Sequence, residues 1–355
     1  MRILLINSEM NDASPLNAGQ AALATALALK VEHVTVLTEV IGVHRALPNL
    51  SVHRIPRWAQ RGLTRLGAGF IFNLPLARLL KREKCDVCLI DGAHRWAYRL
   101  APLLRLRGIP VLLWSTATRS GPSLRTAVAA AQRVAVPVRD AFALDTPKAY
   151  SVGQGINTQR FDLPSTRALA PEIIYAGPLS ANRRVGLMID AMAYLRAAAS
   201  DIPWRLKLVG PSVTMQDHIY LHGLMEKVAL LGLASHVEFV GALEQQELPR
   251  LYQRAFLFFN ASPTGSLNKA ALEALACGCP LLTTDGVLHQ LLADYPDMCA
   301  DDVSAFALAQ RIQTLYAHRA DILPAALRAK VTEHYDLPRF ADRLLDEMTA
   351  LLKNA

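Results

Sequence analysis

The stretch AFLFFNASPTGSLNKAALEALACGCPLLTTD, residues 255–285, decides the fold of this protein. A phenylalanine-rich apolar segment predicts a buried strand, a polar loop with a glycine follows it, and an alanine- and leucine-rich segment predicts a helix. A second apolar run then ends at Asp285. A strand, a helix and a second strand in this order form a crossover unit of a parallel sheet, and the ligands of such sheets bind at the carboxyl ends of the strands.

The loop between this strand and this helix has the composition of a phosphate-binding site. The start of a helix presents unpaired N–H groups and the positive end of the helix dipole, which favour phosphate oxygens. Thr264, Gly265 and Ser266 form the loop, and Lys269 lies in the first helical turn. Glu273 lies about two to three turns further, at about 1.5 Å per residue, within reach of the sugar of a bound nucleotide. The alternative is a solvated carboxylate, but its neighbours are apolar and a lone buried carboxylate needs a partner.

Both halves of the chain repeat this alternation of strands and helices, which indicates parallel sheets. A chain of 355 residues also exceeds what one hydrophobic core supports. We therefore expect an α/β fold of two Rossmann-like domains, residues 1–160 and 161–335, with the boundary near residues 157–171. Residues 336–355 predict an amphipathic closing helix. Strands are expected at 2–6, 33–40, 85–90, 109–114, 172–177, 204–210, 237–241, 255–262 and 280–285, and helices at 19–29, 100–108, 185–199 and 269–278.

The composition excludes several classes of protein. Hydrophobic residues make up 52% and charged residues 19%, without repeats or low-complexity tracts, so neither a disordered chain nor a solenoid is expected. The amino-terminal segment lacks a cleavable signal pattern, and no run of 18 apolar residues occurs, so we expect a cytoplasmic protein. The pair Cys85 and Cys88 lies in a strand pattern and predicts buried, reduced thiols rather than a metal site. The pair Asp301 and Asp302 precedes a helical segment and predicts a cap, so no metal is expected.

Four segments of the C-terminal half resemble, in order and spacing, the motifs of family 4 glycosyltransferases with the GT-B fold. They are SVGQGINTQRF (151–161), YAGPLSANRRVGLMIDAM (175–192), HVEFVGALEQQELPRLYQRA (236–255) and LEALACGCP (272–280). The N-terminal half resembles the family only loosely. The resemblance implies two domains facing across a cleft, with the C-terminal helix packing back toward the N-terminal domain. It also implies transfer of a hexosyl or related group from a nucleotide-sugar, a UDP- or GDP-sugar, with retention of configuration and without a cofactor or metal.

The resemblance gives roles to individual residues of the loop and helix. Glu273 matches the second glutamate of the family's paired-glutamate motif, which holds the ribose of the donor. Gly265 stands where the family has the first carboxylate, so this chain departs from the pattern at the donor sugar. Ser266, Asn268 and Lys269 are the polar residues of the loop that are left to contact that sugar.

The segment GPLSANRR, which begins at Gly177, matches the family's phosphate-binding segment. Arg183 matches a phosphate-binding lysine, Pro178 stands in the place of an arginine, and Arg184 is the residue left to substitute for it. Cations here would stabilise the charge that accumulates on the leaving diphosphate. A solvated turn is the alternative. In the N-terminal half, Gly19 stands where the family has a pair of glycines facing the donor phosphates, and we include Gly19 and Gly177 in the donor-binding set.

His94 follows the expected strand at 85–90, on the edge of the sheet where ligands collect. An imidazole could orient or deprotonate an acceptor hydroxyl, because its ordinary pKa suits that task. A histidine that is only hydrogen-bonded in a loop is the alternative. After the next strand, where the family often has a histidine, this chain has Ser115 and Thr116. The resemblance implies that no protein nucleophile takes part.

The positive charge of the chain is concentrated in its N-terminal half. Residues 1–160 hold 21 Lys/Arg and 9 Asp/Glu, a net +12, whereas residues 161–355 hold 17 and 21, a net −4. Residues 54–84 hold eight basic residues and one acid, interleaved with aromatics. Such a segment can lie on an anionic bilayer, so we expect a peripheral protein on the inner face of the cytoplasmic membrane. The alternative is an ordinary core helix with solvated arginines. Nucleic acid is not expected, because no recognition helix, RNA-binding motif or zinc module occurs.

The expected partners are therefore a nucleotide-sugar and a saccharide acceptor. A lipid-linked acceptor, such as a polyprenyl-diphosphate sugar or a lipopolysaccharide core, would connect the chain to polysaccharide or lipopolysaccharide biosynthesis. Two alternatives remain open at the level of sequence. Gly265 and Pro178 motivate a non-catalytic nucleotide-sugar-binding partner protein, and the same fold also supports a nucleotide-sugar epimerase that acts without an acceptor.

Overall fold

The computed structural model describes residues 1–56, 68–165, 170–199, 201–262, 265 and 267–353. It confirms the α/β class and the two Rossmann-like units, each built on its own parallel sheet. One unit comprises Met1–Gly155 and Asp336–Ala355, and the other comprises Ile156–Tyr335. Residues 156–160 therefore belong to the second unit, five residues earlier than the expected boundary.

The described part of the first unit contains a seven-stranded sheet in the order β3-β2-β1-β4-β5-β6-β7, with every neighbouring pair parallel. The strands that the sequence pattern predicts lie at its centre, and shorter strands extend it on both sides. Its strands are β1 (Arg2–Met10), β2 (His33–Ile41), β3 (Leu50–Arg54), β4 (Val87–Asp91), β5 (Val111–Trp114), β6 (Arg133–Val136) and β7 (Ala149–Ser151).

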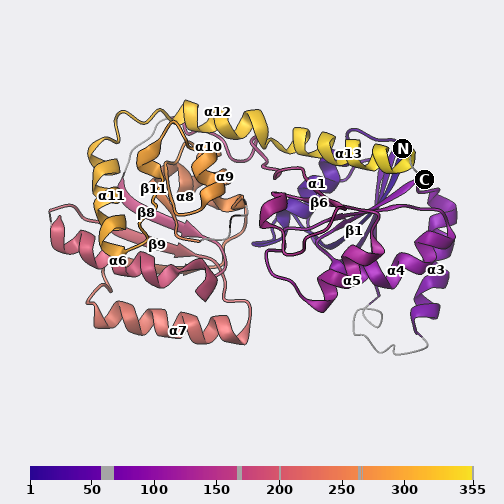
Figure 1. The fold of residues 1–355 in the computed structure, drawn as a ribbon, viewed down its shortest axis with the longest axis horizontal. Coiled ribbons are helices and arrows are strands. Elements are labelled where there is room, and N and C mark those ends of the chain that lie inside the picture. Colours follow the sequence, from indigo (N-terminus) through magenta and orange to yellow (C-terminus); the bar gives the residue numbers. More distant parts are fainter. Residues whose placement is uncertain (57–67, 166–169, 200, 263–264, 266, 354–355) are drawn as a thin grey trace. The chain divides into compact units, whose positions relative to one another are not determined.

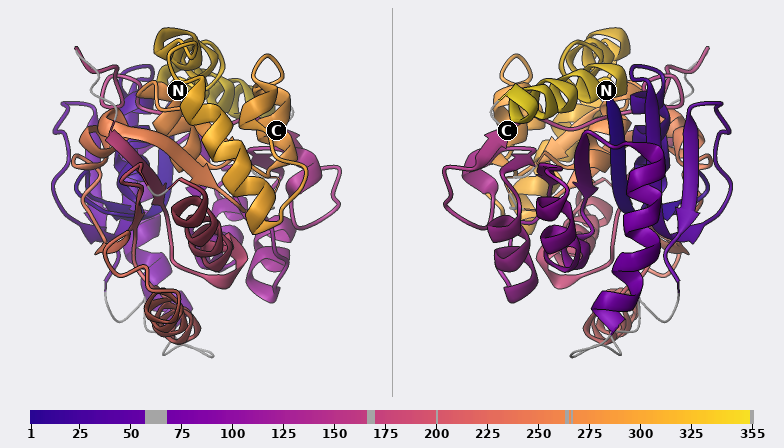
Figure 2. Two further views of the ribbon diagram at one scale, coloured as in Figure 1. Left: turned by 90° about the vertical axis from the view of Figure 1, so that its left-hand side faces the viewer. Right: turned by 90° about the vertical axis from the view of Figure 1, so that its right-hand side faces the viewer.

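Helices cover both faces of this sheet, as Figures 1 and 2 show. One face packs against α3 (Ala68–Glu83), α4 (His94–Leu106) and α5 (Pro122–Ala130), and the other against α1 (Ala18–Ala28) and α13 (Leu337–Lys353). Successive residues of β1 alternate between the two cores, as the period of a strand requires. The ring of Phe340 meets that of Trp114 edge to face at 4.9 Å. The C-terminal helix therefore packs on the N-terminal unit, as expected.

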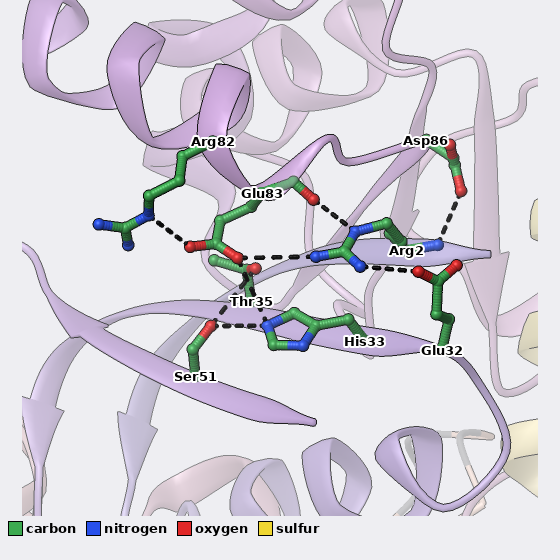
Figure 3. Close-up of polar contacts among 8 residues, drawn as sticks. All are labelled: Arg2, Glu32, His33, Thr35, Ser51, Arg82, Glu83 and Asp86. Carbon is green, nitrogen blue, oxygen red and sulfur yellow. Dashed lines mark hydrogen bonds and ion pairs between the residues drawn. The ribbon is translucent and has the colours of Figure 1, made fainter. Parts of the chain in front are cut away.

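A polar network ties the end of α3 to the amino-terminal edge of the sheet (Figure 3). The backbone N–H of Arg2 donates to Asp86 at 2.7 Å, and its guanidinium donates to the carbonyl of Glu83 and to the carboxylate of Glu32. The Nε2 atom of His33 lies 3.6 Å from the Glu83 carboxylate. These contacts lie at the starts of the strands, opposite the edge where ligands of such sheets bind, so we assign them to the fold.

The described part of the second unit contains a five-stranded parallel sheet in the order β10-β9-β8-β11-β12. Its strands are β8 (Ala170–Ala176), β9 (Arg205–Val209), β10 (Val237–Gly241), β11 (Ala255–Asn260) and β12 (Leu281–Thr283). Its helices are α6 (Val185–Ala198), α7 (Met215–Leu230), α8 (Leu248–Arg254), α9 (Lys269–Ala276), α10 (Gly286–Leu291), α11 (Ala305–Ala317) and α12 (Pro324–His334).

Residues that precede β8 are held inside this second unit by Arg328 of α12 and by the backbone of Tyr335, which follows that helix. The N–H of Ile156 donates to the carbonyl of Tyr335 at 2.7 Å. The guanidinium of Arg328 donates to the carbonyls of Phe161 at 2.7 Å and of Thr158 at 2.8 Å. These bonds explain why the division falls before Ile156.

Gly177 and Gly210 let the ends of β8 and β9 approach closely. The backbone of Gly210 has φ +139, and a Cβ atom there would lie 1.9 Å from the carbonyl oxygen of Gly177. Only glycine fits such a position without moving the backbone.

We predict that Gly210→Ala lowers the free energy of unfolding by about 3 kcal/mol, because the new methyl group overlaps a backbone atom. Urea unfolding followed by far-UV circular dichroism measures this. Gly223→Ala is the control, since no atom lies within 4 Å of the added Cβ inside α7. It should raise the stability by about 0.5–1 kcal/mol through helix propensity. Equal stabilities for wild type and Gly210→Ala would contradict the prediction.

Candidate functional site

The C-terminal sheet has a point where the strand order reverses, between β8 and β11. Ligands of open α/β sheets bind at such points, outside the carboxyl ends of the strands. Gly177 directly follows β8, and Ser262 lies two residues beyond β11. The Nη1 atom of Arg183 donates to the hydroxyl of Ser262 at 3.5 Å. A guanidinium predicted to bind phosphate therefore lies at the reversal point.

The neighbouring Arg184 differs from Arg183 in its position. It is the N-cap residue of α6 and has a left-handed backbone, with φ 52 and ψ 37. A non-glycine residue in this region is uncommon, because its Cβ approaches the following carbonyl. Arg183, which precedes this turn, is the arginine of the pair whose guanidinium is hydrogen-bonded to Ser262.

The start of α9 is organised by asparagine side chains. Asn268 is its N-cap residue, with Oδ1 accepting from the N–H of Ala270 at 3.0 Å. Its Nδ2 donates to Oδ1 of Asn260 at 3.1 Å, and Asn260 in turn donates to the hydroxyl of Thr283 at 3.1 Å. The side chain predicted to contact the donor sugar thus links the ends of β11 and β12 to the helix. Lys269 follows as the first residue of α9.

The tip of the loop before α9 is described at one residue only. Gly265 has φ +63, the left-handed region that glycine adopts without strain. A glutamate at this position, as in the family pattern, would be strained in the same backbone. The predicted site residues Thr264 and Ser266 lie outside the described residues.

Glu273 is buried inside α9, with 3% of its surface exposed. The side-chain amide of Gln245 donates to its Oε1 at 2.7 Å, and Nζ of Lys269, one turn earlier, lies 3.8 Å from the same oxygen. The alternative of a solvated carboxylate is therefore wrong. A buried carboxylate whose partners are an amide and a lysine can accept further hydrogen bonds from hydroxyl groups.

Burial raises the pKa of Glu273 from its ordinary 4.5 to about 7. The charges of Lys269 and Arg160 and the hydrogen bond from Gln245 oppose this rise. The carboxyl group is therefore poised to ionise near neutral pH. Hydroxyl donors favour the ionised form, so a ligand that supplies them would lower this pKa.

The N-terminal sheet has a matching reversal point between β1 and β4. The side chain of Gln20 bridges it: its Oε1 accepts from the N–H groups of Ser8 and Glu9, and its Nε2 donates to the carbonyl of Asp91 at 3.1 Å. The preceding residue, Gly19, lies in the first turn of α1. The predicted glycine is therefore at the ligand edge of its sheet.

His94 lies at the same edge, but in a helix rather than a loop. The helix expected over residues 100–108 begins at His94 itself, the first residue of α4. Its Nε2 lies 2.9 Å from the hydroxyl of Ser115, which is buried at the end of β5. Burial lowers the pKa of His94, so the imidazole is neutral near pH 7. A neutral imidazole can either donate or accept a hydrogen bond.

The acidic and cysteine residues give no cluster of metal ligands within the described ranges. Asp301 lies 3.6 Å from His289, and Asp302 accepts from the N–H of Ser304 at 2.7 Å. The helix cap predicted for the acidic pair is supplied by Ser304, the N-cap residue of α11. The aspartates only support the residues before the helix.

Sequence reasoning missed Gln245, Ser262 and Asn260 as parts of this site. Gln245 stands in a polar run that reads as a solvated turn, and only its contact with Glu273 reveals its place. Asn260 is the polar residue that ends a buried strand at the ligand edge, a signal that could have identified it.

The fold and the two reversal points define a protein of the GT-B class. Over 100% of both chains, the structure is similar to a sucrose-phosphate synthase from Thermosynechococcus elongatus, with a TM-score of 0.74 and 18% identity. A glycosyltransferase from Rickettsia africae gives a TM-score of 0.74 and 13% identity, over 100% of this chain and 99% of the other. At these identities the likeness establishes the fold.

Residues 170–318, a part of the second unit, match the family model of the glycosyl transferases group 1. The chain is 28% identical to the lipopolysaccharide core biosynthesis mannosyltransferase LpsB of Rhizobium meliloti, over 68% of this chain and 75% of that protein. It is 30% identical to the mannosylfructose-phosphate synthase of Agrobacterium fabrum, over 32% of this chain and 25% of that protein. This chain therefore covers a quarter of the length of the mannosylfructose-phosphate synthase.

We predict that the ionisation of Glu273 lowers the stability of the unliganded protein as pH rises from 4.5 to 7. The folded carboxyl of Glu273 keeps its proton to a higher pH than the unfolded one, so unfolding releases a proton in this window. The contribution is about 3 kcal/mol at 1.36 kcal/mol per pKa unit. Glu273→Gln cannot ionise and should remove it, leaving the variant the more stable protein at pH 8. Urea unfolding at pH 5 and pH 8 measures both proteins, and identical pH dependences would contradict the assignment.

Proposed function

We propose that the protein transfers a sugar from a nucleoside-diphosphate-sugar to a saccharide acceptor. The observation that carries the proposal is the buried carboxylate of Glu273, which lies on the helix whose start adjoins the reversal point of the sheet. Around that point stand Arg183 and Lys269, the cations that a diphosphate requires. The proposed donor is a UDP- or GDP-sugar, bound without a metal or another cofactor.

The proposed reaction proceeds with retention of configuration, as the family resemblance implies. As the bond between the sugar and the diphosphate breaks, negative charge accumulates on the leaving phosphate. Arg183 and Lys269 stabilise that charge, together with the N–H groups at the start of α9. The acceptor hydroxyl bonds to the anomeric carbon as the bond to the diphosphate breaks, and its proton passes to the leaving phosphate oxygen. No protein nucleophile takes part. On the acceptor side, His94 is the neutral base available to orient the hydroxyl.

Two other functions were open from the sequence, a non-catalytic binding partner and an epimerase. Relatives named as a mannosyltransferase and a synthase support transfer over both. A turnover assay distinguishes these three functions. A transferase releases nucleoside diphosphate only when an acceptor is present, and an epimerase converts the free nucleotide-sugar. A binding protein does neither.

We predict that Glu273→Ala weakens nucleotide-sugar binding by about tenfold to a hundredfold, because the ribose hydroxyls lose an acceptor worth about 1–3 kcal/mol. Isothermal titration calorimetry with UDP- and GDP-sugars measures the change. Glu238→Ala, an exposed carboxylate on β10, is the matched control and should bind as wild type does. Unchanged affinity in folded Glu273→Ala would refute the assignment of the ribose site.

We also propose a lipid-linked or cell-envelope acceptor, reached at an anionic membrane surface. The expected membrane segment, residues 54–84, lies partly outside the described residues. Its described helix, α3, packs on the same face of the sheet as α4 and α5, which lie outside the segment. Together these three helices contain seven Lys/Arg and one Asp/Glu, which supports the proposal. They lie together on one face of the N-terminal sheet (Figure 1). On the opposite face, α13 has three basic and three acidic residues and α1 has no charged residue.

The outward side of α4 combines charge with apolar surface. Leu106 is 82% exposed and Tyr98 is 39% exposed, and Arg105 is exposed beside them. Basic residues attract anionic headgroups at about 1 kcal/mol each, and the apolar side chains can enter the interface. Among the described residues, no helix is long and apolar enough to cross a bilayer. The proposed contact is therefore with the membrane surface.

We predict that the protein floats with vesicles containing phosphatidylglycerol at low salt and not with pure phosphatidylcholine vesicles. Arg105→Glu and Leu106→Glu should each reduce the bound fraction several-fold. The matched controls are Arg339→Glu, on the exposed side of α13, and Leu230→Glu, at an 88% exposed position of α7. Both should bind as wild type does. Wild-type protein that stays with neither vesicle would remove the membrane proposal and leave the donor site untouched.

A further inference from the structure

One side chain of a polar run is turned into the protein beside the proposed ribose site. The run EQQE, residues 244–247, connects β10 to α8 and has exposed side chains at Glu244, Gln246 and Glu247. Gln245 is 7% exposed. Turning one amide of such a run inward removes a polar group from water, which is unfavourable unless the amide is hydrogen-bonded inside. The partner that Gln245 finds is Glu273, and both atoms of that bond are buried.

The hydrogen-bonding capacity of the pair is only partly used. A carboxylate has two acceptor oxygens, and an amide has one acceptor and two N–H donors. The contacts of Glu273 with Gln245 and with Lys269 both involve its Oε1. Within the described part of the chain, no donor is bonded to Oε2 of Glu273 or to the side-chain carbonyl of Gln245. Two acceptors therefore stand on adjacent side chains that are joined by one N–H···O bond.

A vicinal diol supplies what this pair lacks, two O–H donors on neighbouring carbons. We propose that Gln245 is a positioning residue for the donor: it holds one oxygen of Glu273, leaves the other for one ribose hydroxyl, and accepts the second hydroxyl with its own carbonyl. This inference rests on the proposed nucleotide-sugar function and adds a second member to its ribose site. A purely structural Gln245 would hold the carboxylate and never meet the nucleotide.

The two roles are separated by nucleotides that lack one hydroxyl. The probes are UDP and GDP with their 2′-deoxy and 3′-deoxy forms, titrated calorimetrically into the full chain. We expect wild type to prefer the ribonucleotide over each deoxy form by about tenfold, the size of one such hydrogen bond. Each preference is the ratio of the affinity for the ribonucleotide to the affinity for one deoxy form. Gln245→Leu should bring the ratio for one of the two deoxy forms close to one and leave the ratio for the other unchanged. Gln246→Leu, the exposed neighbour, should keep both.

A second variant guards against a folding defect in Gln245→Leu. Gln245→Glu has nearly the same size and places two carboxyls together, which then share a proton. The charged groups around them are Lys269 of α9 and Arg160, with Tyr252 of α8 as a further titratable group. Nucleotide affinity of wild type should rise from pH 6 to pH 8 as Glu273 ionises, whereas that of Gln245→Glu should fall.

The outcomes distinguish this inference from the proposed function. Wild type that binds neither nucleotide would overturn both. Wild type that binds, with both deoxy ratios retained in Gln245→Leu and a rising pH profile in Gln245→Glu, would overturn the role of Gln245 alone. The role of Gln245 would be supported if Gln245→Leu no longer discriminates against one deoxy form, and if nucleotide affinity rises with pH in wild type but falls in Gln245→Glu.

Discussion

The site of the C-terminal unit depends on a carboxylate kept out of water. An ionised group in an apolar helix is strongly unfavourable unless other groups of the protein compensate it. The surroundings of Glu273 do so incompletely: Gln245 supplies one strong hydrogen bond, and Lys269 stands at the edge of ion-pair distance. The carboxylate of Glu273 can therefore still accept hydrogen bonds from a ligand. In the proposed donor site, Arg183 and the helix start at Asn268 hold the diphosphate, and the attached sugar uses that capacity.

The two units use the same principle at their ligand edges, with different chemistry. Both sheets reverse their strand order, and in both a side chain spans the reversal: Arg183 in the second unit and Gln20 in the first. A guanidinium brings positive charge and leaves donors for phosphate, whereas an amide bonded on both sides brings no charge. His94 beside it is neutral. The second unit therefore suits an anionic ligand, and the first an uncharged hydroxyl compound.

The sequence predicted the buried strands and the helices that cover them, because their apolar periods are strong. It missed elements whose signal is weak: α7 buries only Leu224 and Val228, and β7 has three residues. Within the site, Glu273 could be identified from its apolar neighbours, and Arg183 from the family motif. Gln245 could not, because whether a glutamine in a polar turn points inward depends on a partner 28 residues away. The start of α4 was placed too late, so the helical setting of His94 was also missed.

The first unit is completed by the end of the chain, since α13 covers one face of its sheet. During synthesis the ribosome delivers the seven strands first and their covering helix last, after the whole second unit. Until then the apolar face of the sheet around Trp114 lacks Phe340 and the helix that covers it. The second unit is contiguous and can fold as soon as it emerges. Translation order therefore favours folding of the second unit before the first, although the strands of the first unit are made first.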